Sequence, residues 1–261
     1  MYHHRLIVSY KGTNYFGWQD LGINELKPTV EGIILNALKK ICKYQYCTIS
    51  AASRTDAGVH AQGQVIKISI TLKIHSDKLL LGMNSLLPDD IRILQCQLCN
   101  IEFNSNKDSR SKEYHYYFCA DKISNPIFND IVEYIPFNKY ALTSCLDIKL
   151  MQEACKLFIG EHDFYSFAKR DTTMLSTFRT LFTCEIMVSE SLLLENKIYY
   201  LKIVGNGFLR YMVRYIVGAL FSLGRNELSL SDISEALSMH KENKISPKAK
   251  SHGLHLIHIS Y

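Results

Sequence analysis

The sequence is poor in the features that mark secreted and membrane-spanning proteins. The stretch from Met1 to Tyr10 lacks the apolar core of about 7 to 15 residues that a signal peptide needs. No window approaches the ~18 consecutive apolar residues of a membrane span. These absences predict a cytoplasmic protein that does not associate with membranes.

Closely spaced metal ligands are equally scarce. Of the eight cysteines, only Cys96 and Cys99 form a close pair. A tetrahedral zinc site usually needs a second pair, so the cysteines are expected to be free thiols in a reducing compartment. A zinc-dependent nucleobase deaminase would need H-x-E and P-C-x-x-C motifs, whereas Gln95 precedes Cys96. The sequence therefore predicts no metal site.

What the chain does contain is enough apolar surface for a core and a mild positive charge. It has 261 residues, of which 47% are hydrophobic, and this argues against disorder. A formal net charge of +5 and a pI near 8.6 permit a polyanionic partner. Charge alone does not identify that partner as RNA.

Hydrophobic periodicity predicts a β-α-β-β-α-β order in the first half of the chain, the ferredoxin-like pattern. Thr29 is the expected N-cap of the first helix, which carries an apolar stripe from Val30 to Ile41. The other expected elements are strands at 4–10, 47–52, 64–70 and 91–98 and a helix at 76–87.

A similar order recurs with longer connections in the second half. Strands are expected at 113–119, 182–188, 198–204 and 254–260, and helices at 146–158, 208–223 and 231–239. We therefore predict an α+β protein of two ferredoxin-like (RRM-like) halves, 1–105 and 106–261. The halves would form an extended, mostly antiparallel sheet with a central active-site cleft, because ligands favour crevices between domains.

Three stretches carry residues suited to chemistry. The first runs from Ser53 to Ala61 and places Asp56 in a charged loop between two apolar runs, with Gly58 permitting a tight turn. Taken alone, such a loop is more often a solvated turn with an Asx motif. The functional interpretation of this loop depends on the resemblance that all the stretches together show.

The second stretch, Lys112 to Phe118, alternates like a strand, so that Tyr114, Tyr116 and Phe118 share one face. Tyrosines are common in strands, and core packing is the ordinary explanation for Tyr116 and Tyr117. The third, Asn206 to Gly218, has Arg210 and Arg214 four residues apart, which would put both on one face of a helix. An anionic neighbour would explain two such arginines; solvated arginines over a core helix are the alternative.

A further loop, Tyr10 to Gln19, mixes aromatic residues, glycines and Lys11. Its aromatic rings could stack on unpaired bases, and the lysine could meet a phosphate. A packed cluster of Tyr15, Phe16 and Trp18 is the competing interpretation.

Together these stretches resemble the tRNA pseudouridine synthase A family over nearly the whole chain, from Tyr10 to Tyr261. The resemblance implies that Asp56 is the essential nucleophile. It implies that Tyr114, in the K-x-Y-x-Y pattern, stacks on the flipped uracil, and that Arg214, in the M-V-R pattern, pairs with the aspartate. Arg54 would hold the flipped state of the RNA.

Two departures from the family pattern stand out. Lys11 replaces a residue that is usually acidic, and Asn106 stands where the family has an arginine. The sequence does not show whether Lys107 or Arg110 substitutes for that arginine.

The resemblance implies a cofactor-free isomerase that converts uridine to pseudouridine at positions 38, 39 and 40 in the anticodon stem-loop of tRNA. It also implies a homodimer in which one tRNA touches both subunits. The alternative is a non-catalytic tRNA-binding relative, which would share the fold but would not need the Asp56 loop.

Overall fold

The structure, a computed structural model, describes residues 1–19, 28–120, 124–136, 146–169, 176–189, 197–240 and 243–261. The chain forms two compact units, each described here by itself. One consists of Met1–Arg110 together with His255–Tyr261, and the other of Ser111–Leu254.

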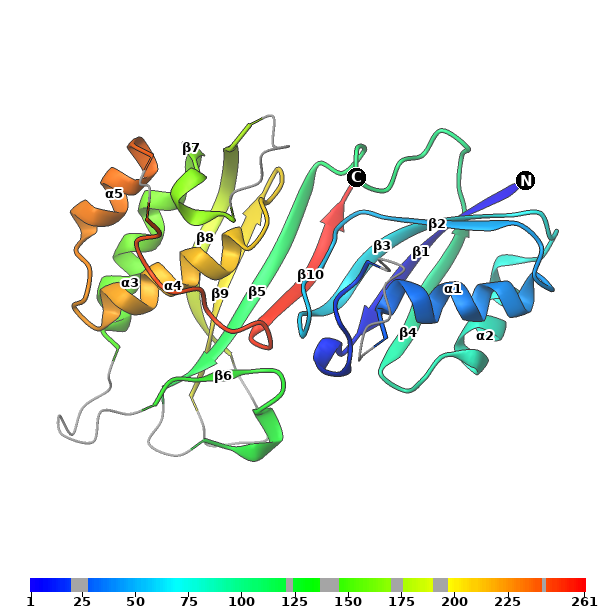
Figure 1. Ribbon diagram of the computed structural model, residues 1–261, viewed down its shortest axis with the longest axis horizontal. Coiled ribbons are helices and arrows are strands. Elements are labelled where there is room, and N and C mark those ends of the chain that lie inside the picture. The colour runs from blue at the N-terminus through cyan, green and yellow to red at the C-terminus, as the bar shows by residue number, and fades with distance from the viewer. Residues whose placement is uncertain (20–27, 121–123, 137–145, 170–175, 190–196, 241–242) are drawn as a thin grey trace. The chain divides into compact units, whose positions relative to one another are not determined.

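The first unit is a sheet with two helices (Figure 1). Its elements are β1 (Tyr2–Tyr10), α1 (Val30–Ile41), β2 (Cys47–Ala51), β3 (His60–Ile70), α2 (Ser76–Leu86), β4 (Ile91–Leu98) and β10 (Leu254–Ser260). β1 lies between β4 and β3 and is antiparallel to both. β2 pairs with β3 in antiparallel fashion, whereas β10 runs parallel to β3. The last strand of the chain thus completes the sheet formed by the first strands.

Local sequence explains how this unit folds. The Thr29 side chain accepts a hydrogen bond from the Gly32 amide at 3.2 Å, which confirms the predicted N-cap of α1. The apolar stripe of α1 is buried at Val30, Ile34, Ala37 and Leu38 and half-buried at its other positions. Helices α1 and α2 contact each other, and they contact β2 and β4, respectively. Along β1 every second residue is buried, from His4 to Tyr10, as expected for a strand with one face on the core.

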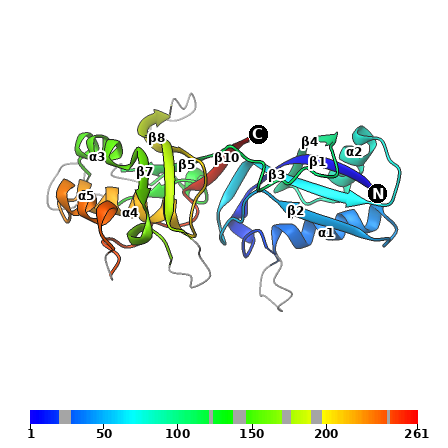
Figure 2. The same cartoon turned by 90° about the horizontal axis from the view of Figure 1, so that it is seen from above.

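The second unit combines a sheet with three helices in its described residues. Its elements are β5 (Ser111–Cys119), β6 (Glu133–Tyr134), α3 (Ile148–Cys155), β7 (Gly160–Asp163), β8 (Phe178–Ser189), β9 (Ile198–Gly205), α4 (Met212–Gly224) and α5 (Leu230–Ser238). β5, β9, β8 and β7 pair in that order, all antiparallel, and β6 runs parallel to β5. Figures 1 and 2 show the three helices on the same side of this sheet.

Helix α4 is the centre of the second core. Nearly all of its residues are buried, and Phe221 packs edge-on against Tyr116 and Phe118 of β5. The predicted alternation of β5 is therefore confirmed: Tyr114, Tyr116 and Phe118 are buried on one face. Tyr117 lies on the other face beside Tyr200.

The α+β class and the mixed, mostly antiparallel strand pairing are confirmed. Strands β6 and β7 were not predicted, because two and four residues are too few to show a periodicity. The expected helix 208–223 begins only at Met212, so the prediction that Arg210 and Arg214 share a helical face is wrong. The backbone of Tyr211 adopts a left-handed conformation and separates Arg210 from the helix. The predicted central cleft stays a prediction.

No helix within the described ranges is both long and apolar enough to cross a membrane.

Candidate active site

Asp56 begins a tight turn in the first unit, between β2 and β3. The Val59 amide donates to the Asp56 carbonyl at 3.1 Å, and Gly58 has a φ of 78°. A positive φ at the third residue is the signature of a type II turn, which favours glycine there. The Asp56 side chain is half-buried, so its carboxylate can meet a ligand while the turn fixes its backbone.

The residue before Asp56 is clamped by a distant loop. The buried Thr55 hydroxyl is 2.7 Å from the Tyr10 hydroxyl, and the Thr55 carbonyl accepts from the Trp18 amide at 3.0 Å. Gly17 has a φ of +94°, and a Cβ there would lie 2.7 Å from the Thr55 carbonyl oxygen. Only glycine lets this loop come so close to the Asp56 turn.

The entrance to the turn is held by Gln64 of β3, which is fully buried. Its side-chain amide donates to the Ser53 carbonyl at 2.6 Å, and its side-chain oxygen accepts from the Ser53 amide at 3.2 Å. Both backbone groups of Ser53 are therefore satisfied by one side chain. This pairing fixes the path of the chain three residues before Asp56.

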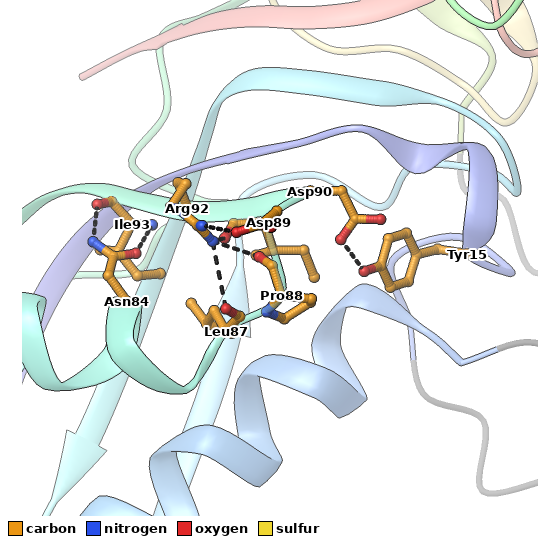
Figure 3. A network of polar contacts seen from close by, with 9 residues as sticks. Tyr15, Asn84, Leu87, Pro88, Asp89, Asp90, Arg92 and Ile93 are labelled. Atoms are coloured by element: carbon orange, nitrogen blue, oxygen red, sulfur yellow. Dashed lines mark hydrogen bonds and ion pairs between the residues drawn. The ribbon is translucent and has the colours of Figure 1, made fainter.

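A polar network supports the clamping loop from the other side (Figure 3). Tyr15 donates its hydroxyl to Asp90 at 2.5 Å, and the Lys11 amide donates to the Asp90 carbonyl at 2.9 Å. Burial and the neighbouring Asp90 raise the pKa of Tyr15, so its hydroxyl stays protonated. Arg92 braces the same turn through the Asp89 carboxylate and the Pro88 carbonyl. The Asp56 turn thus rests on contacts that reach back to the start of β4.

These contacts decide between the two interpretations of the aromatic loop. Trp18 and Tyr15 are 1% and 5% exposed, so they pack in the protein and do not offer their faces to a base. Phe16 is 53% exposed and remains suited to stacking. Arg54, two residues before Asp56, is also exposed.

Tyr114 lies in the second unit, on β5 opposite Ile203 of β9. It is 6% exposed, and the Phe208 ring meets it edge-on at 5.1 Å between centroids. Phe208 lies three residues after the end of β9 and therefore links the Tyr114 ring to the segment that leads into α4. Such an edge-to-face arrangement is favourable for two aromatic rings.

Two residues before Tyr114, Lys112 is almost completely buried. Desolvation, reinforced by the nearby Arg179 guanidinium, lowers the pKa of Lys112 to about 8. A lysine at such a site carries its charge at a cost in stability below that pH.

Arg214 lies in the first turn of α4 and is 9% exposed. Its Nε donates to the Ala249 carbonyl at 2.8 Å, and the Ala249 amide donates back to the Arg214 carbonyl at 3.0 Å. Its guanidinium carbon is 5.4 Å from the centre of the Tyr211 ring. The φ of +65° at Tyr211 costs about 1 kcal/mol or more for a residue with a Cβ.

The four predicted site residues therefore come from both units. Asp56 and Arg54 share one loop of the first unit, and Tyr114 and Arg214 belong to the second. Sequence reasoning missed the residues that position the Asp56 turn, namely Tyr10, Thr55 and Gln64, because their partners are 11 to 45 positions away. Within the described ranges, no group of three or more His, Cys, Asp or Glu residues could hold a metal ion.

Comparison with known proteins gives a consistent result over the length of the chain. A sequence model described as tRNA pseudouridine synthase matches residues 6–101 and 154–261. The chain is 51% identical to tRNA pseudouridine synthase A 2 of Desulfotalea psychrophila, covering 99% of this chain and 98% of the relative. The chain is 35% identical to tRNA pseudouridine synthase A of Pseudothermotoga lettingae, with 98% of both chains covered. The chain is 34% identical to tRNA pseudouridine synthase A of Listeria innocua, with 100% of both chains covered.

Among solved structures the similarity is weak. A Cbf5-Nop10-Gar1 complex gives a TM-score of 0.30 at 14% identity, over 82% of this chain and 44% of that one. That value supports no conclusion about the site.

Proposed function

The chain belongs to the tRNA pseudouridine synthase family and is an isomerase that converts uridine in tRNA to pseudouridine, and we propose that it acts at positions 38, 39 and 40 through Asp56. The observation that carries the proposal is the Asp56 turn, a half-exposed carboxylate whose backbone is pinned on both sides. A fixed carboxylate is what an attack on a bound ribose requires.

The reaction detaches uracil from C1′ of the ribose, turns it and rejoins it through C5. The target nucleotide must therefore leave the base stack, and the pocket must retain the free base. Asp56 acts on the ribose, either by attacking C1′ or by removing a proton from C2′. A glycosidase generally needs a second carboxyl group to protonate its leaving oxygen. Uracil leaves as a delocalised anion, so one aspartate can suffice.

The other roles follow the family pattern. Tyr114 stacks on the flipped base. Its ring is only 6% exposed, so this role requires the residues that cover the ring to move when the nucleotide enters. Arg54 holds the flipped state, which suits its exposed position beside Asp56. Arg214 keeps Asp56 ionised and oriented, since a guanidinium is always charged and pairs well with a carboxylate.

The proposal needs no cofactor, and it extends to a cytoplasmic homodimer in which one tRNA contacts both subunits. The mass of the protein in solution tests the dimer separately, and a monomer alone would contradict it.

Release of tritium from C5-labelled uridine tests the reaction directly, because C5 loses its hydrogen when pseudouridine forms. The substrates are a full tRNA transcript and an anticodon stem-loop, with variants in which uridines 38, 39 and 40 are replaced by cytidine. Wild type is expected to release tritium from the first two substrates alone, and Asp56→Ala from none. Binding without release by the wild type would instead favour the non-catalytic tRNA-binding relative.

A further inference from the structure

Three cations gather around one aromatic ring in the second unit. The Lys248 ammonium lies 3.5 Å from the centre of the Tyr211 ring, and the guanidinium carbons of Arg210 and Arg214 lie 5.1 Å and 5.4 Å from it. Arg210 also donates to the Tyr211 hydroxyl at 3.3 Å. We call Arg210, Tyr211, Arg214 and Lys248 the Tyr211 cluster.

Charge in the surrounding sequence is of one sign. The segment 205–226 contains three arginines and no Asp or Glu, and the segment 243–261 contains three lysines and no Asp or Glu. The two segments are brought together by the fold at Arg214 and Ala249. Acidic charge comes from outside them, from the buried Glu133 of β6, which acts on Tyr116 and His252 together with Arg214. Such a local excess of positive charge favours an anionic ligand.

The position of Lys248 is built into the fold. A Cβ on Gly218 of α4 would lie 1.9 Å from the Pro247 carbonyl oxygen, so the chain before Lys248 packs directly on the helix. On the other side of Lys248, Ala249 exchanges two hydrogen bonds with Arg214. Lys248 is therefore held on the Tyr211 ring by fixed backbone on both sides.

The backbone of Tyr211 is strained in a way that serves this arrangement. A left-handed conformation is unusual for an aromatic residue. Because Tyr211 is the N-cap of α4, Arg210 lies outside the helix. Its side chain is exposed and lies beside the Tyr211 ring. Strained residues of this kind gather at ligand-binding sites.

The cluster is linked to Tyr114 through Phe208. Phe208, which meets the Tyr114 ring edge-on, precedes Arg210 by only two residues. If Tyr114 stacks on the flipped uracil, the phosphates of that nucleotide and its neighbour come within reach of the segment that follows Phe208.

The geometry points to the Tyr211 cluster as a clamp for the RNA backbone, in which Arg210 and Lys248 bind phosphates beside the flipped nucleotide. This inference rests on the proposed function and assigns a role to residues outside the four predicted site residues. Arg210 supplies a planar fork of donors for phosphate oxygens, and Lys248 supplies a compact charge oriented by the ring.

The test is tRNA binding as a function of salt concentration for Arg210→Gln, Lys248→Gln and the double variant. Each lost phosphate contact lowers the slope of log affinity against log salt by about 0.7 to 0.9. The double variant is expected to lose roughly 1.5 in slope and to bind tRNA about tenfold more weakly at moderate salt. The matched control is Arg225→Gln, the same charge change at the opposite end of α4, which is expected to bind like the wild type.

Three results would overturn the clamp. One is an unchanged slope and affinity in the double variant. Another is an equal loss in Arg225→Gln, which would mean that net charge alone matters. The third is a drop in melting temperature with no change in slope, which would make the cluster merely structural.

Tritium release by the wild type, measured on the same preparations, separates this inference from the proposed function. If the wild type binds tRNA without releasing tritium, the proposed function fails, and the salt slopes still decide the role of the clamp.

Discussion

The Asp56 turn holds a single carboxylate with neutral hydrogen bonds, whereas the Tyr211 cluster gathers three cations around one ring. Both regions depend on a glycine that lets two backbone segments come unusually close, Gly17 in the first and Gly218 in the second. The surroundings of Asp56 fix its position to suit chemistry on a bound ribose. The surroundings of Tyr211 concentrate positive charge, which favours binding of a polyanion. The contacts that position Asp56 lie in the first unit and the proposed phosphate clamp lies in the second, so substitutions in the two regions should have different effects on rate and on tRNA binding.

The largest effect on turnover among the supporting residues is expected from Gly17→Ala. The new Cβ would lie 2.7 Å from the Thr55 carbonyl oxygen, at a φ that disfavours alanine. We expect a loss of about 1 to 3 kcal/mol in the free energy of unfolding and a roughly 100-fold lower kcat, because the Asp56 turn must shift. Chemical denaturation and single-turnover kinetics measure the two.

Gly82→Ala provides the control for this substitution. A Cβ there would meet only the Ile41 side chain, at 3.4 Å, in the middle of α2. It should leave kcat unchanged and stabilise the protein by about 0.5 to 1 kcal/mol. Equal kinetics for both alanine variants would show that the clamp on Thr55 does not position Asp56.

A smaller effect on turnover, and a larger one on binding, is expected from Gly218→Ala. A Cβ there would overlap the Pro247 carbonyl and push the Lys248 segment away from α4. We expect a loss of about 1 to 3 kcal/mol in stability and weaker tRNA binding. Because the displaced segment also holds Arg214 through Ala249, the rate at saturating tRNA should fall too, but by less than in Gly17→Ala. Affinity and single-turnover rate should be measured on the same samples. A fall in rate at unchanged affinity would contradict the separation of the two regions.

The smallest effect concerns stability alone, at Lys112. Its pKa of about 8 in the folded protein lies below the ordinary value of 10.5, so the unfolded chain binds more protons between these two pH values. The cost of burying the charge is fully present below pH 8 and disappears as the pH rises towards 10.5. Lys112→Met should therefore be more stable than wild type by about 1 to 3 kcal/mol at pH 7.

That advantage should shrink steadily between pH 8 and 10.5, as measured by denaturation at a series of pH values. A variant less stable than wild type at pH 7 would show that the Lys112 ammonium makes contacts that outweigh its burial.

Sequence reasoning recovered the parts of the molecule that local pattern encodes. The N-cap at Thr29, the alternation of β5 and the need for glycine at position 58 all follow from neighbouring residues, and the structure has them as predicted. The turn at Asp56 was located because its residues resemble a family motif.

What the sequence could not reveal is contact between distant segments and departure from regular backbone. Trp18 clamps Thr55 from 37 positions away, and Lys248 reaches Tyr211 across the same separation. The left-handed backbone of Tyr211 has no signal in a run of residues that favours helix, and this is why α4 was predicted to begin too early. Such features depend on the fold and leave no mark on the local sequence.

The central claim is that Asp56 performs the chemistry, and single-turnover tritium release by Asp56→Asn tests it most directly, with Asp90→Asn as the matched control. Asp90 supports the same region through Tyr15. Asp56→Asn is expected to bind tRNA and melt like the wild type but to lose on the order of 10⁴ in rate. Asp90→Asn should melt at a lower temperature and keep most of its rate. A rate for Asp56→Asn within tenfold of wild type would contradict the account.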